Sequence, residues 1–316
     1  MIEYKHVKKY FGEQLIIQDI SLTVQEGEFV VIIGPSGCGK TTTIKMLNRL
    51  LDASEGEIRI NGIDNKSMDL IQLRTGIGYV IQQIALFPNM TVEENISVVP
   101  KIMKWSREKT EARVRELMKM VDMPYEQYAK KYPRQLSGGQ QQRIGVLRAM
   151  AVNPPIIIMD EPFGALDPIT REILQNEVKK IQEELKITII FITHDMHEAM
   201  KLADRIIFMD RGQILQDAAP ADMLQNPANE TVARFIRLQE VVPSDTQKTA
   251  ASLMQPVSQA IETEGAVVVQ ESDLLESIGL KYNVTGARKI YVQNSSNTIV
   301  GEITLESLIL NSVKQV

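Results

Sequence analysis

Residues 30–41 read VVIIGPSGCGKT, an apolar run that enters a glycine-rich turn and ends on a lysine and a threonine. The segment GPSGCGKT (34–41) fits the pattern G-x-x-x-x-G-K-[ST], and Ile44 and Leu47 follow it at helical spacing. A strand, a glycine-rich loop and a helix in this order predict a phosphate-binding loop. The plain alternative is a glycine-rich turn followed by an incidental lysine.

The residue types of this loop suit phosphate binding. Its glycines allow backbone conformations in which successive N–H groups point at phosphate oxygens, and the following helix adds the positive end of its dipole. Lys40 places a charge on the β- and γ-phosphates, and the Thr41 hydroxyl can ligate Mg²⁺. The predicted nucleotide-contacting residues are Gly34, Pro35, Ser36, Gly37, Cys38, Gly39, Lys40, Thr41 and Thr42.

An acidic pair follows about 120 residues later, in the run IIIMDEP (156–162). A carboxylate at the carboxyl end of a parallel strand lies at the rim where open α/β sheets bind ligands. We expect Asp160 to hold Mg²⁺, directly or through a water, and Glu161 to take a proton from an attacking water. The alternative is two solvated acids at a strand end, and the phosphate loop argues against it.

The chain is organised as a large unit and a small one. Up to about residue 238, short apolar strands alternate with amphipathic helices, which predicts a mostly parallel α/β sheet. The pattern stops between about Glu240 and Gln255, where a proline and small polar residues predict a linker. Beyond it we expect a β-α-β-β-α unit, with strands at 266–270, 289–293 and 298–304 and helices at 271–282 and from Leu305.

Composition excludes several classes of protein. The 316 residues carry 35 Lys+Arg against 40 Asp+Glu, and a net charge of −5 argues against a nucleic-acid clamp. The apolar runs are strand length, far below the ~20 residues of a membrane helix, and the start shows no signal peptide. The single cysteine excludes an internal disulfide and fits a reducing compartment.

Residues 136–140 read LSGGQ and precede a helix that carries Ile144 and Leu147. This resembles the signature sequence of ATP-binding cassette (ABC) ATPases, and the other motifs of that family match in order over about residues 1–238. They are Phe11 at the adenine-stacking position with Tyr10 as an alternative, Gln82 at the Q-loop with Gln83 as an alternative, ALD (165–167) at the D-loop, and His194 in FITHD at the H-loop.

The resemblance implies an α/β fold: a P-loop NTPase of ABC type with a RecA-like core, a helical subdomain and an N-terminal antiparallel β subdomain. It sets the expected boundaries at 1–238 for the ATPase domain, 239–255 for the linker and 256–316 for a small α+β tail. The tail resembles a single CBS (cystathionine-β-synthase-type) motif, although Ser307 stands where that family often has a ribose-binding acid. Dimerisation or packing and regulation both remain open for it.

The resemblance also implies roles for single residues. In that family two cassettes face each other head to tail, so Ser137, Gly138, Gly139 and Gln140 of one copy face the γ-phosphate on the other copy's Lys40 loop. Glu161 would act as general base, His194 would hydrogen-bond the γ-phosphate, and Asp167 would lie at the dimer interface. Gln82 would sense Mg²⁺ and water, with Thr41 and Asp160 as the other metal-site residues. The implied cofactors are ATP and Mg²⁺.

The resemblance further implies an importer. The run ALFPNMTVEENI (85–96) is similar to the groove that receives a permease's cytoplasmic helix, and 91–109 and 132–151 are most like ATPases of glycine betaine, carnitine or choline importers. The expected partners are integral-membrane permease subunits, indirectly an extracellular substrate-binding protein, and a second copy of the chain. The expected location is peripheral, on the cytoplasmic face of the cell membrane.

Other functions stay open beside this one. They are the ATPase of an importer for another small solute, a soluble cassette protein acting on DNA or ribosomes, and a nucleotide-dependent regulatory switch. Two further interpretations concern side chains. Cys38 is interpreted as a small residue that fits the loop rather than a redox switch, and the charged stretch from Arg107 to Lys119 as a solvated helix face.

Overall fold

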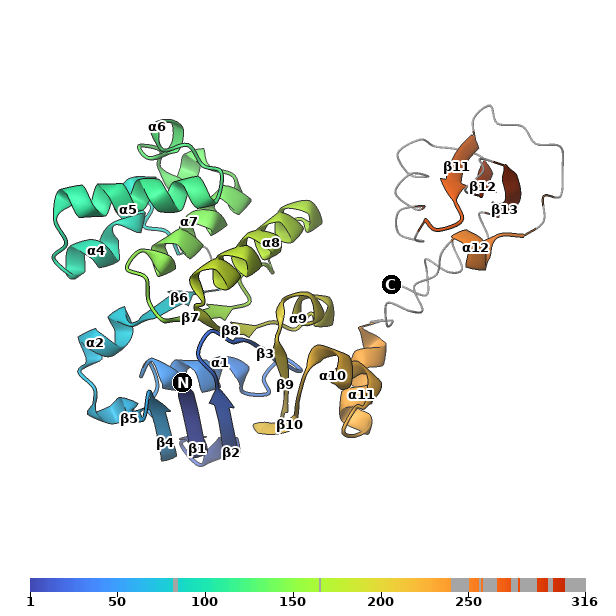
Figure 1. Cartoon of the computed structure of the whole chain (residues 1–316). Helices are drawn as coiled ribbons and strands as arrows, with labels where there is room; N and C mark the ends of the chain where they lie inside the picture. The colour runs from blue at the N-terminus through green and yellow to red at the C-terminus, as the bar shows by residue number, and fades with distance from the viewer. Residues whose placement is uncertain are drawn as a thin grey trace. The chain divides into compact units, whose positions relative to one another are not determined.

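The computed structural model describes residues 1–81, 85–164, 166–239, 250–255, 257, 266–273, 278, 289–294 and 298–304. The chain divides into two compact units, Met1–Gln239 and Glu240–Val316. Figure 1 labels their helices and strands. Among the described residues, no helix has both the length and the apolar character that a membrane crossing requires.

A six-stranded sheet forms the centre of the first unit. Its strands, in spatial order, are β10 (Gln213–Ala218), β9 (Arg205–Asp210), β3 (Phe29–Ile33), β8 (Thr188–Ile192), β7 (Ile156–Asp160) and β6 (Ile77–Val80). All neighbours run parallel except β9 and β10, which form an antiparallel hairpin. Strands β3, β7 and β8 are buried along their whole length, as expected of parallel strands covered on both faces.

A second, antiparallel sheet and the first helix cover one face of the central sheet. The sheet contains β2 (Gln14–Val24), β1 (Ile2–Phe11), β4 (Glu55–Ile60) and β5 (Ile63–Asp64), in that order. One apolar core joins it to α1 (Lys40–Leu47) and to alternate residues of the central strands, such as Ile156 and Ile158. Figure 1 shows α1 between the two sheets.

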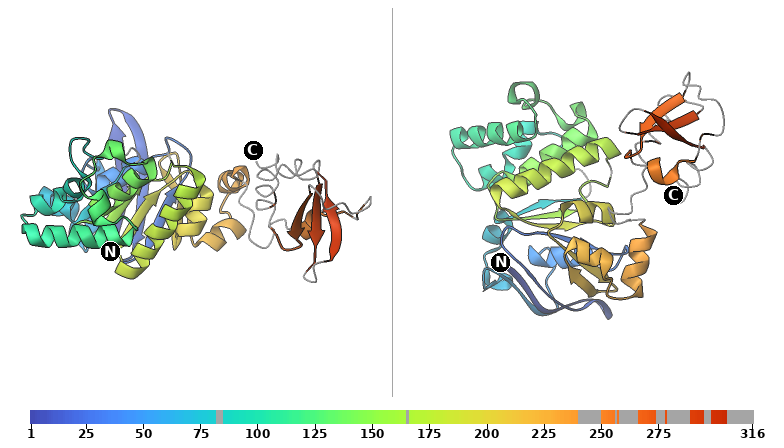
Figure 2. Two further views of the ribbon diagram at one scale, coloured as in Figure 1. Left: turned by 90° about the horizontal axis from the view of Figure 1, so that it is seen from above. Right: turned by 45° about the vertical axis from the view of Figure 1, so that its right-hand side comes forward.

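Helices cover the other face of the central sheet, as both Figure 1 and Figure 2 show. Ile157 and Met159, which alternate with the residues above, pack there with Val146 and Met150 of α7. The helices on this side are α3 (Val92–Ile96), α4 (Val98–Ile102), α5 (Arg107–Met120), α6 (Tyr125–Tyr128), α7 (Gly138–Met150) and α8 (Pro168–Leu185). The structure therefore contains the expected α/β sheet, the antiparallel β subdomain and the helical subdomain.

Shorter helices connect these layers. They are α2 (Leu70–Thr75), α9 (Met196–Leu202), α10 (Pro220–Gln225) and α11 (Glu230–Leu238), with 3₁₀ turns at Asn65–Ser67 and Pro133–Gln135. Helix α9 follows β8 directly, so its N-terminus lies at the carboxyl edge of the central sheet. Helix α1 ends at Leu47, and Arg49 has a positive φ of 53°, so Leu50 and Leu51 lie beyond the helix.

The interpretation of Arg107–Lys119 as a solvated face is wrong at one residue. Arg113 is buried, and its guanidinium donates to the carbonyl oxygens of Met150 (3.1 Å) and Ala151 (3.3 Å) and to the side chain of Asn153. These carbonyls end helix α7 and lack intrahelical partners. Arg113 therefore ties α5 to the end of α7.

The second unit contains a three-stranded sheet of β11 (Ala266–Gln270), β12 (Lys289–Gln293) and β13 (Ile299–Ile303). β11 and β12 are parallel, and β12 and β13 are antiparallel. The expected linker, 239–255, includes residues at its C-terminal end that belong to the second unit. Ala250–Leu253 forms helix α12, which packs into the core of this unit, and Gln255 bridges to Glu302.

The predicted helix at 271–282 lies mostly outside the described residues. Ser307 and the helix predicted from Leu305 lie wholly outside them.

Candidate nucleotide-binding site

The glycine-rich loop between β3 and α1 has the backbone that was expected of it. Gly34 has a φ of +151°, and a Cβ added there would lie 2.0 Å from the carbonyl oxygen of Met209. Gly39 caps α1 with a φ of +109°, and its added Cβ would meet Ile17 at 2.4 Å. Neither position tolerates a side chain, so the loop stays thin and its N–H groups remain accessible.

The β9–β10 hairpin and Cys38 hold the loop in place. Gly212 in the hairpin turn donates its N–H to the carbonyl of Cys38 at 2.9 Å. The Cys38 side chain is buried in the core beside Gly34, and burial raises the pKa of its thiol. A buried, protonated thiol reacts poorly, which supports the interpretation of Cys38 as a small residue that fits here.

Lys40 folds back over the loop. Its ammonium donates to the carbonyl oxygens of Gly34 (2.7 Å) and Pro35 (3.0 Å). Both acceptors are neutral, so the positive charge remains available to an anion that enters the loop. The position of this charge at the N-terminus of α1 suits a phosphate group.

The structure brings Thr41 and Asp160 together at the carboxyl edge of the sheet. The Thr41 hydroxyl donates to Asp160 Oδ1 at 3.1 Å, across 119 residues of sequence. Burial raises the pKa of Asp160, and the neighbouring Glu161 carboxylate raises it further. A hydroxyl and a carboxylate are hard oxygen ligands of the kind that Mg²⁺ prefers.

The metal would need further ligands from outside the protein. Among the described residues, no group of three or more His, Cys, Asp or Glu side chains is placed to hold an ion. Mg²⁺ commonly takes one or two protein ligands and completes its shell with substrate phosphates and waters. The pair of Thr41 and Asp160, next to a loop built for phosphate, therefore fits a Mg²⁺–nucleotide complex.

Glu161 and His194 form a second pair on the same edge. Glu161 has a φ of +45°, uncommon for a residue with a side chain, and its N–H donates to the carbonyl of Ile192 at 2.9 Å. This bond places Glu161 opposite the end of β8, where His194 follows. His194 Nδ1 lies 3.4 Å from Glu161 Oε2, and 59% of the histidine side chain is exposed.

The signature segment caps helix α7. Ser137 accepts a hydrogen bond from the Gln140 N–H, and the Gln140 side chain accepts one from the Ser137 N–H. A Cβ added at Gly138 would meet nothing within 4 Å, whereas one at Gly139 would lie 2.3 Å from Thr170 on α8. Ser137 and Gly138 therefore present an open helix N-terminus, and Gly139 permits close helix packing.

The signature segment and the phosphate loop belong to opposite sides of the central sheet. Helix α1 packs on the face of β7 that carries Ile158, and helix α7 packs on the face that carries Met159. Figure 1 shows the two helices on either side of the sheet. This arrangement suits a site that a second copy of the chain completes.

Of the remaining predicted residues, some lie on the described surface and others lie outside the described residues. Asp167 is exposed and caps α8 by accepting the Thr170 N–H at 3.0 Å. Phe11 ends β1 with 47% of its surface exposed, and the Lys9 ammonium lies 5.1 Å from its ring centre. Gln82, its alternative Gln83, and Ala165 lie outside the described residues.

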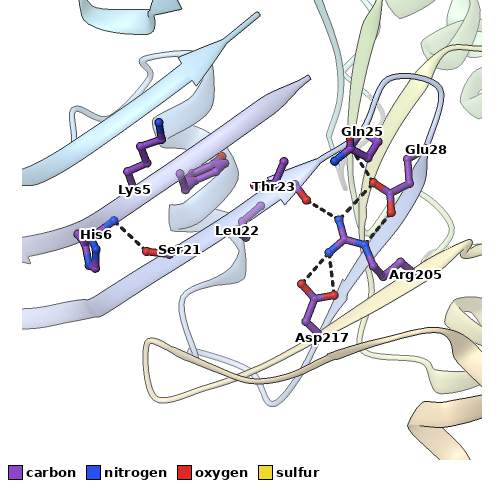
Figure 3. Close-up of a pocket in the computed structure, with 10 residues that line it drawn as sticks. Lys5, His6, Ser21, Leu22, Thr23, Gln25, Glu28, Arg205 and Asp217 are labelled. Atoms are coloured by element: carbon purple, nitrogen blue, oxygen red, sulfur yellow. Dashed lines mark hydrogen bonds and ion pairs between the residues drawn. The ribbon is translucent and has the colours of Figure 1, made fainter. Parts of the chain in front are cut away.

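A surface hollow of about 700 Å³ lies elsewhere, between the antiparallel sheet and the β9–β10 hairpin (Figure 3). Arg205 is its most heavily bonded residue and pairs with Glu28 and Asp217, each at 2.6 Å. Two other basic side chains line it, those of Lys5 and His6, and each has a carboxylate within 4 Å, from Glu3 and Asp19 respectively. Its charges are already matched, so this hollow is a poor site for a phosphate.

Sequence reasoning missed two side chains next to the site. The Tyr79 hydroxyl on β6 is buried near Asp160, and burial and this carboxylate raise its pKa. Glu198 on α9 is buried and accepts a hydrogen bond from the hydroxyl of Thr193, the residue before His194. The register of β6 and β7 places Tyr79 opposite Ile158, on the same face of the sheet as Asp160. Because this position depends on how the two strands pair, the sequence alone could not predict it.

Comparison with known proteins gives consistent results. The family model described as "ABC transporter" matches residues 17–164. The carnitine transport ATP-binding protein OpuCA of Listeria monocytogenes is 48% identical over 98% of this chain and 77% of its own length. The glycine betaine/carnitine/choline transport ATP-binding protein OpuCA of Bacillus subtilis is 47% identical over 99% of this chain and 81% of its own.

A solved structure of similar fold is the dimeric ATP-binding cassette MJ0796 in a post-hydrolysis state, bound to ADP and Pi. It matches with a TM-score of 0.62 and 38% identity, over 70% of this chain and 99% of its own.

Proposed function

The chain belongs to the ABC transporter family, and we propose that it is the ATP-binding and ATP-hydrolysing subunit of an importer for quaternary-amine osmoprotectants. One observation carries the proposal: 48% identity over 98% of the chain with a protein named for carnitine transport. The name of the second relative adds glycine betaine and choline to the substrates that we propose.

Each side chain of the site has a proposed role. The loop from Gly34 to Thr42 holds the phosphates, with the Lys40 ammonium drawn from the loop carbonyls to the β- and γ-phosphates. Thr41 and Asp160 hold Mg²⁺, which neutralises phosphate charge, together with Gln82. Phe11 stacks on the adenine. The exposed ring of Phe11 and the 3.1 Å contact between Thr41 and Asp160 support these assignments.

Glu161 is the proposed general base. A carboxylate that takes a proton from water must lie beside the reacting phosphate and be oriented by its neighbours. The bond from Glu161 N–H to Ile192 and the contact with His194 supply that orientation. His194 holds the γ-phosphate by a hydrogen bond from its exposed ring.

We propose that two copies assemble head to tail around two nucleotides. Ser137, Gly138, Gly139 and Gln140 of one copy then complete the phosphate site of the other, and Asp167 lies between the copies. The open N-terminus of α7 supplies N–H groups and a positive dipole end where negative charge collects, so no arginine is required there.

The assembly includes membrane permease subunits, which the chain drives from the cytoplasmic side of the membrane. An extracellular substrate-binding protein delivers the solute to the permease and does not touch this chain. The proposed ATPase domain is 1–238. The second unit is proposed as a CBS-like regulatory or dimerisation module, because α12 and the sheet β11–β13 form a small core of their own.

Uptake by cells that lack this gene tests the proposal. Deletion should abolish uptake of radiolabelled glycine betaine, carnitine or choline at high osmolarity, and the wild-type gene should restore it. Lys40→Ala should fail to restore uptake because the phosphate loop loses its charge. Lys180→Ala is the matched control, since Lys180 is an exposed lysine on α8 with one weak ion pair.

Two results would contradict the proposal. Loss of uptake of a different small solute would indicate an importer of other specificity. Unchanged uptake, with the purified chain hydrolysing ATP but never fractionating with membranes, would indicate a soluble cassette protein.

A further inference from the structure

A buried polar cluster lies next to His194 along the chain. Glu198 of α9 is at its centre, and only 8% of the glutamate side chain is exposed. The Thr193 hydroxyl donates to Glu198 Oε2 at 2.6 Å, and Gln175 of α8 donates to Glu198 Oε1 at 3.2 Å. Thr193 and Gln175 are themselves buried, so their polar groups depend on these bonds.

The cluster holds the backbone on both sides of His194. The Thr193 hydroxyl also accepts the N–H of Asp195 at 3.0 Å, which closes a tight turn with His194 at its centre. Asp195 then caps α9 by accepting the N–H of His197 at 2.8 Å. The direction of the His194 side chain therefore depends on Thr193, and Thr193 depends on Glu198.

Arg171 of α8 extends the cluster toward the Asp167 turn. Its guanidinium donates to the Leu166 carbonyl at 3.1 Å and lies 3.8 Å from Asp195 and 4.0 Å from Glu198. Helices α8 and α9 lie side by side in Figure 1. One arginine thus joins the turn that carries Asp167 to the turn that carries His194.

We propose that Glu198 is a positioning residue for ATP hydrolysis, which holds the His194 turn in place through Thr193 while Arg171 ties that turn to the Asp167 turn. The inference rests on the proposed function, since it assigns a support to the residue that contacts the γ-phosphate. Glu198 hydrogen-bonds Thr193 and Gln175, neither of which belongs to the phosphate loop. Its effect therefore passes through His194, and it should alter turnover and not nucleotide binding.

A double-mutant cycle in the full-length chain tests this. Glu198→Ala should lower kcat for ATP about 10- to 100-fold, the effect of a small misplacement of a catalytic group, and leave KM within about twofold. Glu198→Gln, which still accepts the Thr193 hydrogen bond, should restore most of the rate. In a His194→Ala background, Glu198→Ala should cause no further loss, because the group that it positions is gone.

Two further variants keep the result interpretable. His197→Ala changes an exposed neighbour on the same helix and should behave as wild type. Thr193→Val removes the donor of the 2.6 Å bond while keeping the side-chain shape, so it should reproduce the kcat loss if Glu198→Ala fails to fold.

Three outcomes would overturn the inference: equal losses from Glu198→Ala with and without His194, an unchanged kcat, or a loss confined to KM. A wild-type chain without ATP turnover would instead remove the proposed function itself.

Discussion

At the scale of single residues, the site depends on a few backbone conformations that bring distant side chains together. Glu161 adopts a positive φ of 45° directly after β7, which is costly for a residue with a side chain. The bond from its N–H to Ile192 on the next strand holds that conformation. Strain of this kind is common where a catalytic group is held ready.

Glu161→Gln tests the role of this carboxylate. The amide cannot accept a proton, so we expect ATP hydrolysis to fall by about 100-fold or more while ATP still binds. Because hydrolysis no longer separates the copies, the variant should accumulate as a dimer in ATP and Mg²⁺ on size-exclusion chromatography. Turnover at the wild-type rate would contradict the assignment of the base.

Glu198 makes stability depend on pH. Burial raises the pKa of Glu198, and its neighbours are Thr193, Gln175, Arg171 and Asp195. A carboxyl with a raised folded-state pKa binds its proton more tightly in the folded protein. Ionisation of Glu198 therefore lowers the free energy of unfolding. This decrease begins above the usual carboxyl pKa and is complete once the pH has passed the raised pKa of the folded state.

Glu198→Gln should remove this loss. Relative to wild type, its Tm should gain as pH rises from about 4.5 to 7, by a few degrees, since ~1 kcal/mol shifts Tm about 2–4 °C in a domain of this size. Thermal melts across that range measure it, with the exposed Glu172→Gln as the control. A Tm difference that stays constant with pH would be inconsistent with a buried Glu198 whose charged form lowers stability.

At the scale of secondary-structure elements, several helices begin at a side chain that caps their N-terminus. Thr91, Ser106, Ser137, Asp167 and Asp195 each cap a helix by accepting backbone N–H groups. Two of these caps, Ser137 and Asp167, are also residues to which we assign dimer contacts. The same side chains thus start a helix and face the proposed partner.

Arg113 provides the corresponding contact at a helix C-terminus, and its removal should be costly. Arg113→Met removes the donor to the Ala151 carbonyl and leaves the Met150 carbonyl with the Asn153 N–H alone, so we expect about 1–3 kcal/mol of lost unfolding free energy. Denaturant melts measure this. Arg115→Met is the matched control, because the ion pairs of Arg115 with Glu111 and Glu126 are exposed and worth about 0–1 kcal/mol. Equal losses in both variants would refute the capping role.

At the scale of the whole molecule, the two units have separate cores. The core that surrounds α1 lies wholly within Met1–Gln239, which also contains every described residue of the nucleotide site. We expect a chain that ends at Gln239 to fold and to hydrolyse ATP within about twofold of the full-length rate, since domains with their own core fold alone. Loss of ATP turnover in this fragment would show that the second unit supports catalysis.

The same truncation separates the two roles that remain open for the second unit. Uptake measured against external osmolarity should lose its osmotic response if the unit is regulatory. An unchanged response would leave dimerisation or packing.

The sequence by itself determined the local chemistry of this protein. The phosphate loop and the acidic strand end are each a continuous stretch of sequence, and their residue types follow from what phosphate and Mg²⁺ require. The signature segment is also a continuous stretch, and its resemblance to the ABC family identified it. Buried strands and amphipathic helices were predictable for the same reason, because burial imposes a periodic pattern on neighbouring residues. Arg113 escaped prediction because it stands in a highly charged stretch, although it lies on the buried face of α5 beside Val114 and Leu117.

Only the tertiary structure decided which distant groups meet. The contact between Thr41 and Asp160 spans 119 residues and follows from parallel strands ending at one edge. The cluster of Arg171, Gln175, Thr193 and Glu198 joins two helices and a strand end through pairings that no local pattern encodes. The placement of α1 and α7 on opposite faces of the sheet also follows from long-range packing and not from a local sequence pattern. Long-range packing, unlike periodicity, leaves no signature in neighbouring residues, and it places the side chains to which we assign catalysis.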